Sequence, residues 1–190
     1  MALADEPLPV PPIRERTVLP VVVVALVLVG VVFGGYVTAG ALSSTAGGPV
    51  DVAGLVRVRP PAGWEIGERF SDPPVVRLTR GGGNLDVAAG SFAGSAEALM
   101  REYVSGSLEP QAEQLSVSGV EAVRLASGLR AVRVSYVGTF RDVPVPIEGE
   151  VTAVVSDSGV GVIFDGWASS GQLQSVRGDV RTMIETAEVA

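Results

Sequence analysis

The stretch Val132-Arg133-Val134-Ser135-Tyr136-Val137-Gly138-Thr139-Phe140 alternates apolar and polar side chains more regularly than any other part of the chain. Successive side chains of a β-strand project to opposite faces, so this period of two predicts a strand that lies with one face on a core. The apolar face carries Val132, Val134, Tyr136 and Phe140, and the other face carries Arg133, Ser135 and Thr139.

The residues that follow predict the neighbouring strand. Arg141-Asp142 is suited to a tight turn, and residues 143–156 are again strand-like. A tight turn at this point predicts two cross-strand pairs, Arg133 with Glu150 and Ser135 with Glu148.

The rest of the chain from residue 54 onward is also rich in strands, with one helix in its middle and another at its end. Further strands are predicted at 54–59, 75–78, 85–88, 119–125 and 160–167. The first helix follows Ser95, which is a suitable N-cap, and the second begins near residue 171. Their apolar stripes are Leu99, Met100, Tyr103, Val104 and Leu108 in the first helix, and Leu173, Val176, Val180, Met183, Ile184 and Ala187 in the second. The pattern predicts an α+β fold, an antiparallel sheet with two flanking helices, the last packing across the sheet.

Asp157-Ser158-Gly159 follows an apolar strand, as the catalytic triplet of an aspartic protease does. Such an enzyme needs two carboxylates that share one proton, and this chain has one such triplet. The residue before the aspartate is the polar Ser156, where a protease has a buried apolar residue. Asp, Ser and Gly are also ordinary turn residues, so the sequence favours a hairpin turn between the strands that end near residue 156 and begin at Val160.

Two other groups of residues have a chemical and a structural interpretation. Gly81-Gly82-Gly83 could cradle a phosphate, but a strand follows it and lysine is absent, so a hairpin loop is favoured. Glu148 and Glu150 point the same way from one strand and could bind calcium or serve a glycosidase. The favoured interpretation is a solvated face with Arg133 opposite.

Trp64 and Trp167 are the two tryptophans of the chain. An indole offers a large apolar area and one N–H, which makes each a candidate for a partner or ligand surface. Packing of each ring at the edge of the core is the favoured interpretation.

The composition excludes several kinds of chemistry. The chain has 190 residues and a net charge of −7, with no cysteine or histidine, and all 14 basic residues are arginine. Thiol and imidazole catalysis, disulfides, histidine–zinc sites and lysine Schiff bases are therefore absent. An acidic chain without a basic patch does not suit nucleic acid. We expect no cofactor, no metal and no catalytic residue.

The N-terminal region predicts a membrane anchor. Residues 1–17 are rich in proline and predict a disordered cytoplasmic tail, and residues 18–42 carry no charge and are long enough to span a bilayer. Arg14 and Arg16 precede the span, which places the N-terminus inside and the remainder outside. The alternative is a signal peptide that is cleaved after Ala41.

The predicted span is followed by a flexible linker, 43–51, and an extracytoplasmic α+β domain, 52–190. Within the span, Gly30 and Gly34 form a GxxxG pair. Such a pair permits close approach of a second helix and weak self-association, but glycine is also common in membrane helices in general.

Several short motifs resemble a known family. Pro61-Ala62-Gly63-Trp64 after an apolar strand, a helix, a long β-meander and a closing helix with Met183-Ile184-Glu185-Thr186 are similar to the Mog1/PsbP-like fold. The resemblance covers about residues 52–190 and is greatest to small actinobacterial envelope proteins of the LpqN lipoprotein type. It implies a sheet flanked by helices, used for binding or scaffolding, with no catalytic residue to carry over. This chain lacks the lipobox cysteine of those lipoproteins.

Three hypotheses of function follow. The first is a membrane-anchored binding or adaptor domain of the cell envelope, non-catalytic, with an envelope protein as its partner. The second is a carrier or sensor of a lipid or other small hydrophobic ligand, held in a cavity between sheet and helix. The third is a carboxylate-dependent hydrolase that uses Asp157 or the pair Glu148 and Glu150.

Overall fold

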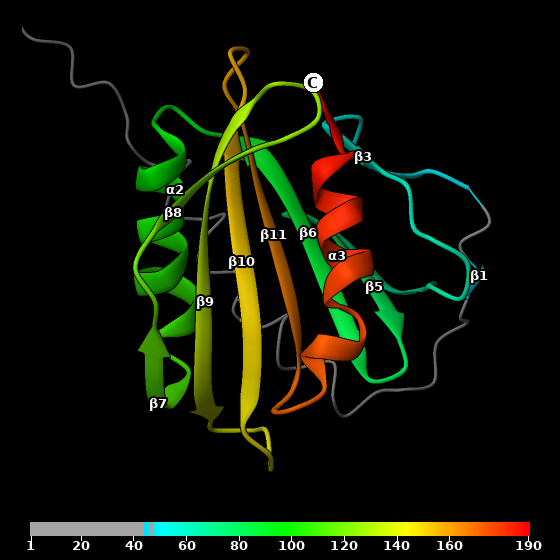
Figure 1. Cartoon of the computed structure of the whole chain (residues 1–190). Helices are drawn as coiled ribbons and strands as arrows, with labels where there is room; N and C mark the ends of the chain where they lie inside the picture. The colour runs from blue at the N-terminus through cyan, green and yellow to red at the C-terminus, as the bar shows by residue number, and fades with distance from the viewer. Residues whose placement is uncertain (1–43, 46–47) are drawn as a thin grey trace, which may run out of the picture.

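The computed structural model describes residues 44–45 and 48–190, which form two sheets and two principal helices (Figure 1). The main sheet is antiparallel, and its strands lie in the order β1-β4-β5-β6-β11-β10-β9-β7, with β8 also paired to β9. The strands are β1 (Ser44–Thr45), β4 (Glu65–Ser71), β5 (Pro74–Arg80), β6 (Gly83–Ser91), β7 (Ala112–Val117), β8 (Glu121–Arg124), β9 (Arg130–Phe140), β10 (Ile147–Val155) and β11 (Val160–Ser169). This α+β architecture confirms the predicted antiparallel sheet with flanking helices.

One face of the sheet is covered by α2 (Ala96–Tyr103), which continues into a π-helical turn at Val104–Leu108. Ser95 is the N-cap, as predicted, and its Oγ accepts a hydrogen bond from the backbone N–H of Ala98 at 3.2 Å. The stripe of this helix packs on the apolar face of β9 that the alternation predicts. The shared core includes Met100, Tyr103, Leu108, Val132, Val134, Tyr136 and Phe140.

The other face of the sheet is covered by α3 (Arg177–Glu185) and by a small sheet of β12, β3 and β2. A 3-10 turn, Leu173–Ser175, leads into α3. The strands of the small sheet are β2 (Val50–Val52), β3 (Val56–Val58) and β12 (Glu188–Val189). All six residues of the predicted closing stripe are buried in this second core: Leu173, Val176, Val180, Met183, Ile184 and Ala187.

Two of the predicted hairpin turns are confirmed. Gly81 and Gly82 have φ angles of +55° and +85° and join β5 to β6. Asp157 is exposed in the turn between β10 and β11, where the backbone N–H of Gly159 donates to the carbonyl of Ser156 at 3.0 Å. Gly159 has a φ of +81°, so a residue without a Cβ suits this corner.

The predicted pairing of β9 with β10 is wrong by two residues. In the structure Glu150 lies opposite Ser135, and Thr152 lies opposite Arg133. The cause is the connection, which occupies residues 141–146 and contains Pro144 and Pro146. Proline has no N–H to donate to the ladder, so β10 begins later than a tight turn would allow. A register shift of two residues leaves every side chain on the same face of the sheet. The residues of β9 that were predicted to face the core are therefore correct.

The strands β4 and β7 have no counterpart in the prediction. Both lie toward the edges of the main sheet and carry mostly exposed or half-buried side chains, so their hydrophobic signal is weak. The segment predicted as linker also contributes residues to the sheets. Ser44–Thr45 pairs with β4, and the predicted domain boundary at residue 52 falls inside β2.

The predicted tail, the span at 18–42 and the pair Gly30 and Gly34 lie outside the described residues. Within residues 44–45 and 48–190, no helix has the length and apolar character needed to cross a bilayer.

Candidate functional site

A pair of buried carboxylates lies in the core between the sheet and α2. Asp86 on β6 and Asp165 on β11 are directly opposite each other in the ladder, and their side chains are 2% and 0% exposed. Burial of an ionised group without compensation is costly, so the surroundings of each carboxylate decide its charge. We call Asp86, Asp165, Arg77, Tyr103 and Tyr136 the carboxylate cluster.

Asp86 is held by a buried guanidinium. Arg77 Nε donates to Oδ1 of Asp86 at 2.7 Å, and its second terminal nitrogen donates to Oδ2 at 3.0 Å. The indole N–H of Trp167 also donates to Oδ2 at 3.0 Å, and the Arg77 guanidinium lies 5.4 Å from the centre of the Trp167 ring. Glu68 accepts a further hydrogen bond from Arg77 at 2.9 Å. This bidentate geometry suits an ionised Asp86.

Asp165 has hydroxyl partners. The Tyr103 hydroxyl from α2 donates to Oδ2 at 2.7 Å, and the Tyr136 hydroxyl from β9 donates to Oδ1 at 3.1 Å. Burial raises the pKa of Asp165 to about 7, and the charge of Asp86 acts in the same direction. The hydrogen bonds from the two tyrosines and the charge of Arg77 act to lower this pKa. Burial and the charge of Asp165 together raise the pKa of Tyr103 and of Tyr136 well above 10.

Gly149 allows Tyr136 to reach Asp165. Tyr136 is on β9 and Asp165 is on β11, so the ring must cross β10, where Gly149 is the residue opposite Tyr136. A Cβ at Gly149 would lie 2.3 to 2.5 Å from three atoms of the Tyr136 ring and hydroxyl. The absence of a side chain at this position is therefore a requirement of the hydrogen bond.

The carboxylate cluster is enclosed, because its carboxylates, tyrosines and guanidinium are each at most 5% exposed. It holds two carboxylates close together, as acid–base enzymes do, but α2 and the sheet seal it from a substrate. The local sequence pattern does not predict this cluster. The feature of the sequence that could have indicated the cluster is Asp165, an acidic residue within the otherwise apolar strand β11, which has no solvent-facing side.

The two tryptophans lie in the two cores. Trp64 is 0% exposed and donates its indole N–H to Asp179 of α3 at 3.0 Å, and Arg80 forms an ion pair with the same carboxylate. Trp167 is 4% exposed and belongs to the core under α2. Neither ring presents a surface in this structure, in agreement with the favoured interpretation of core packing.

Glu148 and Glu150 point to the α3 side of the sheet, but each is engaged within the domain. Glu148 accepts hydrogen bonds from the backbone N–H groups of Gly171 and Leu173, each at 2.9 Å, at the start of the 3-10 turn. Glu150 is only 3% exposed, so the prediction of a solvated face is wrong for this residue.

Two arginines satisfy the Glu150 carboxylate. Arg181 of α3 donates to both of its oxygens at 3.0 and 2.7 Å, and Arg133 lies 3.3 Å from Oε1. Burial acts to raise the pKa of Glu150, but the hydrogen bonds from Arg181 and the charge of Arg133 hold that pKa below its ordinary value. Within the described residues, no group of acidic side chains is arranged to hold a metal ion.

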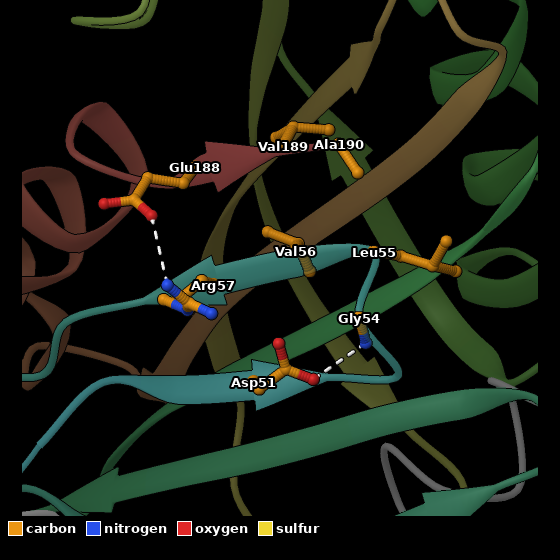
Figure 2. A pocket seen from close by; sticks show the side chains of 8 residues that line it. All are labelled: Asp51, Gly54, Leu55, Val56, Arg57, Glu188, Val189 and Ala190. Atoms are coloured by element: carbon orange, nitrogen blue, oxygen red, sulfur yellow. Dashed lines mark hydrogen bonds and ion pairs between the residues drawn. The ribbon is translucent and has the colours of Figure 1, made fainter.

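A shallow surface hollow of about 210 Å³ lies beside the C-terminus, between the β2–β3 turn and β12 (Figure 2). Asp51, Arg57 and Glu188 supply its charges, and Arg57 Nη1 lies 3.7 Å from Oε2 of Glu188. A hydrogen bond from Arg59, followed by the charges of Arg59 and Arg57, lowers the pKa of Glu188. The hollow is open to solvent and lies outside the layers between sheet and helices.

No helix of the described residues covers the α3 side of β9 and β10, because α3 packs against β11 farther along the sheet (Figure 1). We call this surface the open face. Val137 is 51% exposed there, an unusual value for an apolar residue of a long strand that lies inside the sheet. The residues of the open face are Ser116, Ser135, Val137, Thr139 and Glu148.

No protein-family model matches this chain, and neither does any curated protein. Solved structures do match, and they identify a PsbP-like α+β fold, as the sequence motifs predict. One is the solution structure of cyanobacterial PsbP (CyanoP) from Synechocystis sp. PCC 6803, with a TM-score of 0.54 and 16% identity over 80% of this chain and 94% of that chain. Another is the crystal structure of LpqN involved in cell envelope biogenesis of Mycobacterium tuberculosis, with a TM-score of 0.52 and 13% identity over 80% of this chain and 87% of that chain.

Proposed function

We propose that this chain is a membrane-anchored, extracytoplasmic binding or adaptor domain of the bacterial cell envelope, and that it acts through protein contacts without catalysis. The similarity to LpqN, which is described as involved in cell envelope biogenesis, supports the envelope setting. The uncharged stretch 18–42, with Arg14 and Arg16 before it, supports a single anchor with the domain outside.

The open face is the observation that carries a binding role. Its centre, Val137, is an apolar side chain presented to solvent from a rigid strand, and hydroxyl groups of Ser116, Ser135 and Thr139 surround it. Surfaces of this kind, an apolar centre with a polar rim, are typical of protein contacts. Beside it, the ion pairs of Glu150 with Arg133 and Arg181 hold α3 and the sheet together.

The positions of the acidic residues support a non-catalytic role. Asp157 is exposed in a regular turn, and Glu148 and Glu150 are occupied by contacts within the domain. Asp86 and Asp165 are sealed under α2. The carrier hypothesis requires a cavity between sheet and helix, and in the described residues each of these layers is a core of buried apolar side chains. No observation favours it over the binding role.

In-cell crosslinking tests this proposal. A photo-crosslinking residue is placed at Val137 in the full chain, and the matched control carries it at Arg101, which is exposed on α2 on the opposite side of the sheet. We expect one envelope protein to be captured from Val137 and not from Arg101. Capture of lipid alone, or equal capture of many proteins from both positions, would refute the adaptor role.

The anchor has its own test. Tags are added at both ends of the chain, and intact cells are treated with a protease. We expect the C-terminal tag to be digested, the N-terminal tag to be protected, and the chain in the membrane fraction to retain residues 1–41. A mature chain that begins after Ala41 would replace the anchor with a cleaved signal peptide.

A further inference from the structure

Among the described residues, the carboxylate cluster under α2 has two carboxyl groups and one guanidinium. Asp86 and Asp165 are both buried there, and Arg77 is the one guanidinium that the described cluster places against them. Arg77 is committed to Asp86 on one side and to Glu68 on the other. Asp165 accepts hydrogen bonds from two tyrosine hydroxyls and forms no ion pair within the described residues. The charge of Arg77 acts to lower its pKa, but the pKa remains raised, so this buried carboxyl is neutral only when it holds a proton.

We propose that Asp165 is a reversible proton-binding site, and that loss of its proton loosens α2 from the sheet. The titratable groups that face it come from five elements: Tyr103 of α2, Tyr136 of β9, Asp86 of β6, Arg77 of β5 and, beyond Arg77, Glu68 of β4.

The helix is the element that yields because the other groups lie on strands. Strands β5, β6, β9 and β11 are each fixed by ladders on both sides within the sheet. The helix α2 has eight residues and ends in the π-helical turn Val104–Leu108. The hydrogen bond of Tyr103 to Asp165 is a buried polar contact of this helix with the sheet. Hydration would stabilise an ionised Asp165 carboxylate. Movement of α2 away from the sheet is the smallest rearrangement that would let water reach it.

The direction of the effect follows from the burial of Asp165. In the closed domain its pKa is raised from 3.8 to about 7, and in an opened, hydrated site it returns toward 3.8. Between these values the closed form holds a proton that the open form has released, so opening becomes about ten-fold more favourable for each pH unit. Above about pH 7 both forms are ionised and the effect levels off.

Hydrogen exchange on the full-length chain, corrected for the intrinsic pH dependence of exchange, tests this proposal. From pH 5 to pH 8 we expect the protection of residues 96–108 to fall by about a hundred-fold, as the two pKa values require. The protection of α3, on the opposite face, is the internal reference. In the Asp165→Asn variant the fall in α2 should disappear, because an amide cannot ionise. An unchanged protection of α2, or the same fall in the variant, would overturn the proposal.

A second measurement does not depend on a variant that folds. The carboxyl carbon of Asp165 in the wild-type chain can be followed by 13C NMR from pH 4 to pH 9. We expect a titration with a midpoint near 7. A carboxyl that remains ionised down to pH 5 would show that Asp165 does not hold the proton, whatever the exchange of α2. Neither measurement depends on the open face, so failure here leaves the adaptor role to its own crosslinking test.

Discussion

Substitution of Gly149 by alanine tests whether the contact of Tyr136 with Asp165 shapes the core. The new Cβ would lie 2.3 to 2.5 Å from the Tyr136 ring, so the ring must move and the hydroxyl leaves Asp165. Overpacking of a core costs about 1–3 kcal/mol. A buried polar group left without its hydrogen bond costs about 1–3 kcal/mol. We therefore expect Gly149→Ala to lower the free energy of unfolding by about 3–5 kcal/mol.

Urea unfolding followed by tryptophan fluorescence measures this effect, because Trp64 and Trp167 are buried in the two cores. Gly178→Ala is the matched control: this glycine lies in α3, and a Cβ there meets nothing within 4 Å. Alanine is the better helix former, so the control should be more stable by about 0.5–1 kcal/mol.

The double variant Gly149→Ala with Tyr136→Leu isolates the steric contact. If the ring is the obstacle, the two effects are not additive, and the alanine costs much less when the ring is absent. A Gly149→Ala protein within about 0.5 kcal/mol of the wild type would refute this account of the core, since that range is typical of surface substitutions.

Three other expectations follow from the structure. Because burial raises the pKa of Asp165 from 3.8 to about 7, its contribution to stability is lost as pH rises between these two values. Urea unfolding should show Asp165→Asn gaining about 3 kcal/mol on the wild type between pH 5 and pH 8, and a constant difference would contradict this. Ala53 is exposed in the β2–β3 turn with a φ of +55°, so Ala53→Gly should raise the melting temperature, with a gain of about 0.5–1 kcal/mol; a loss would mean that the turn is not strained. Asp157→Asn should change the free energy of unfolding by less than about 0.5 kcal/mol, because Asp157 is an exposed turn residue.

The sequence predicts the parts of this fold that depend on local periodicity. The alternation in β9 and the stripe of α3 each specify a buried face, and the structure buries those residues. Register is different, because it depends on the length of a connection. Pro144 and Pro146 delay the start of β10, and the predicted pair of Arg133 with Glu150 becomes a diagonal contact at 3.3 Å.

The carboxylate cluster was beyond prediction from local pattern. Asp86 and Asp165 are brought together by the pairing of β6 with β11, two strands that are distant in the sequence. An aspartate on an alternating strand ordinarily predicts a solvent-facing position, and both faces of β11 are covered here. The informative signal was chemical rather than periodic, an acidic residue inside the run from Val160 to Trp167.

The same strand, β9, connects the two proposals, because its neighbouring residues serve opposite faces. Tyr136 points into the core and donates to Asp165, whereas Val137 is exposed on the open face. The buried carboxyl groups on the two sides of the sheet have different partners. Glu150 near the open face forms ion pairs with two arginines, whereas Asp165 under α2 accepts hydrogen bonds from tyrosine hydroxyls. Ion pairs with arginine do not titrate near neutral pH, so the open face keeps its shape over the range in which Asp165 changes its charge. The two halves of the domain can therefore differ in pH response although a single strand carries both, because β9 is fixed by ladders to β10 on one side and to β7 and β8 on the other.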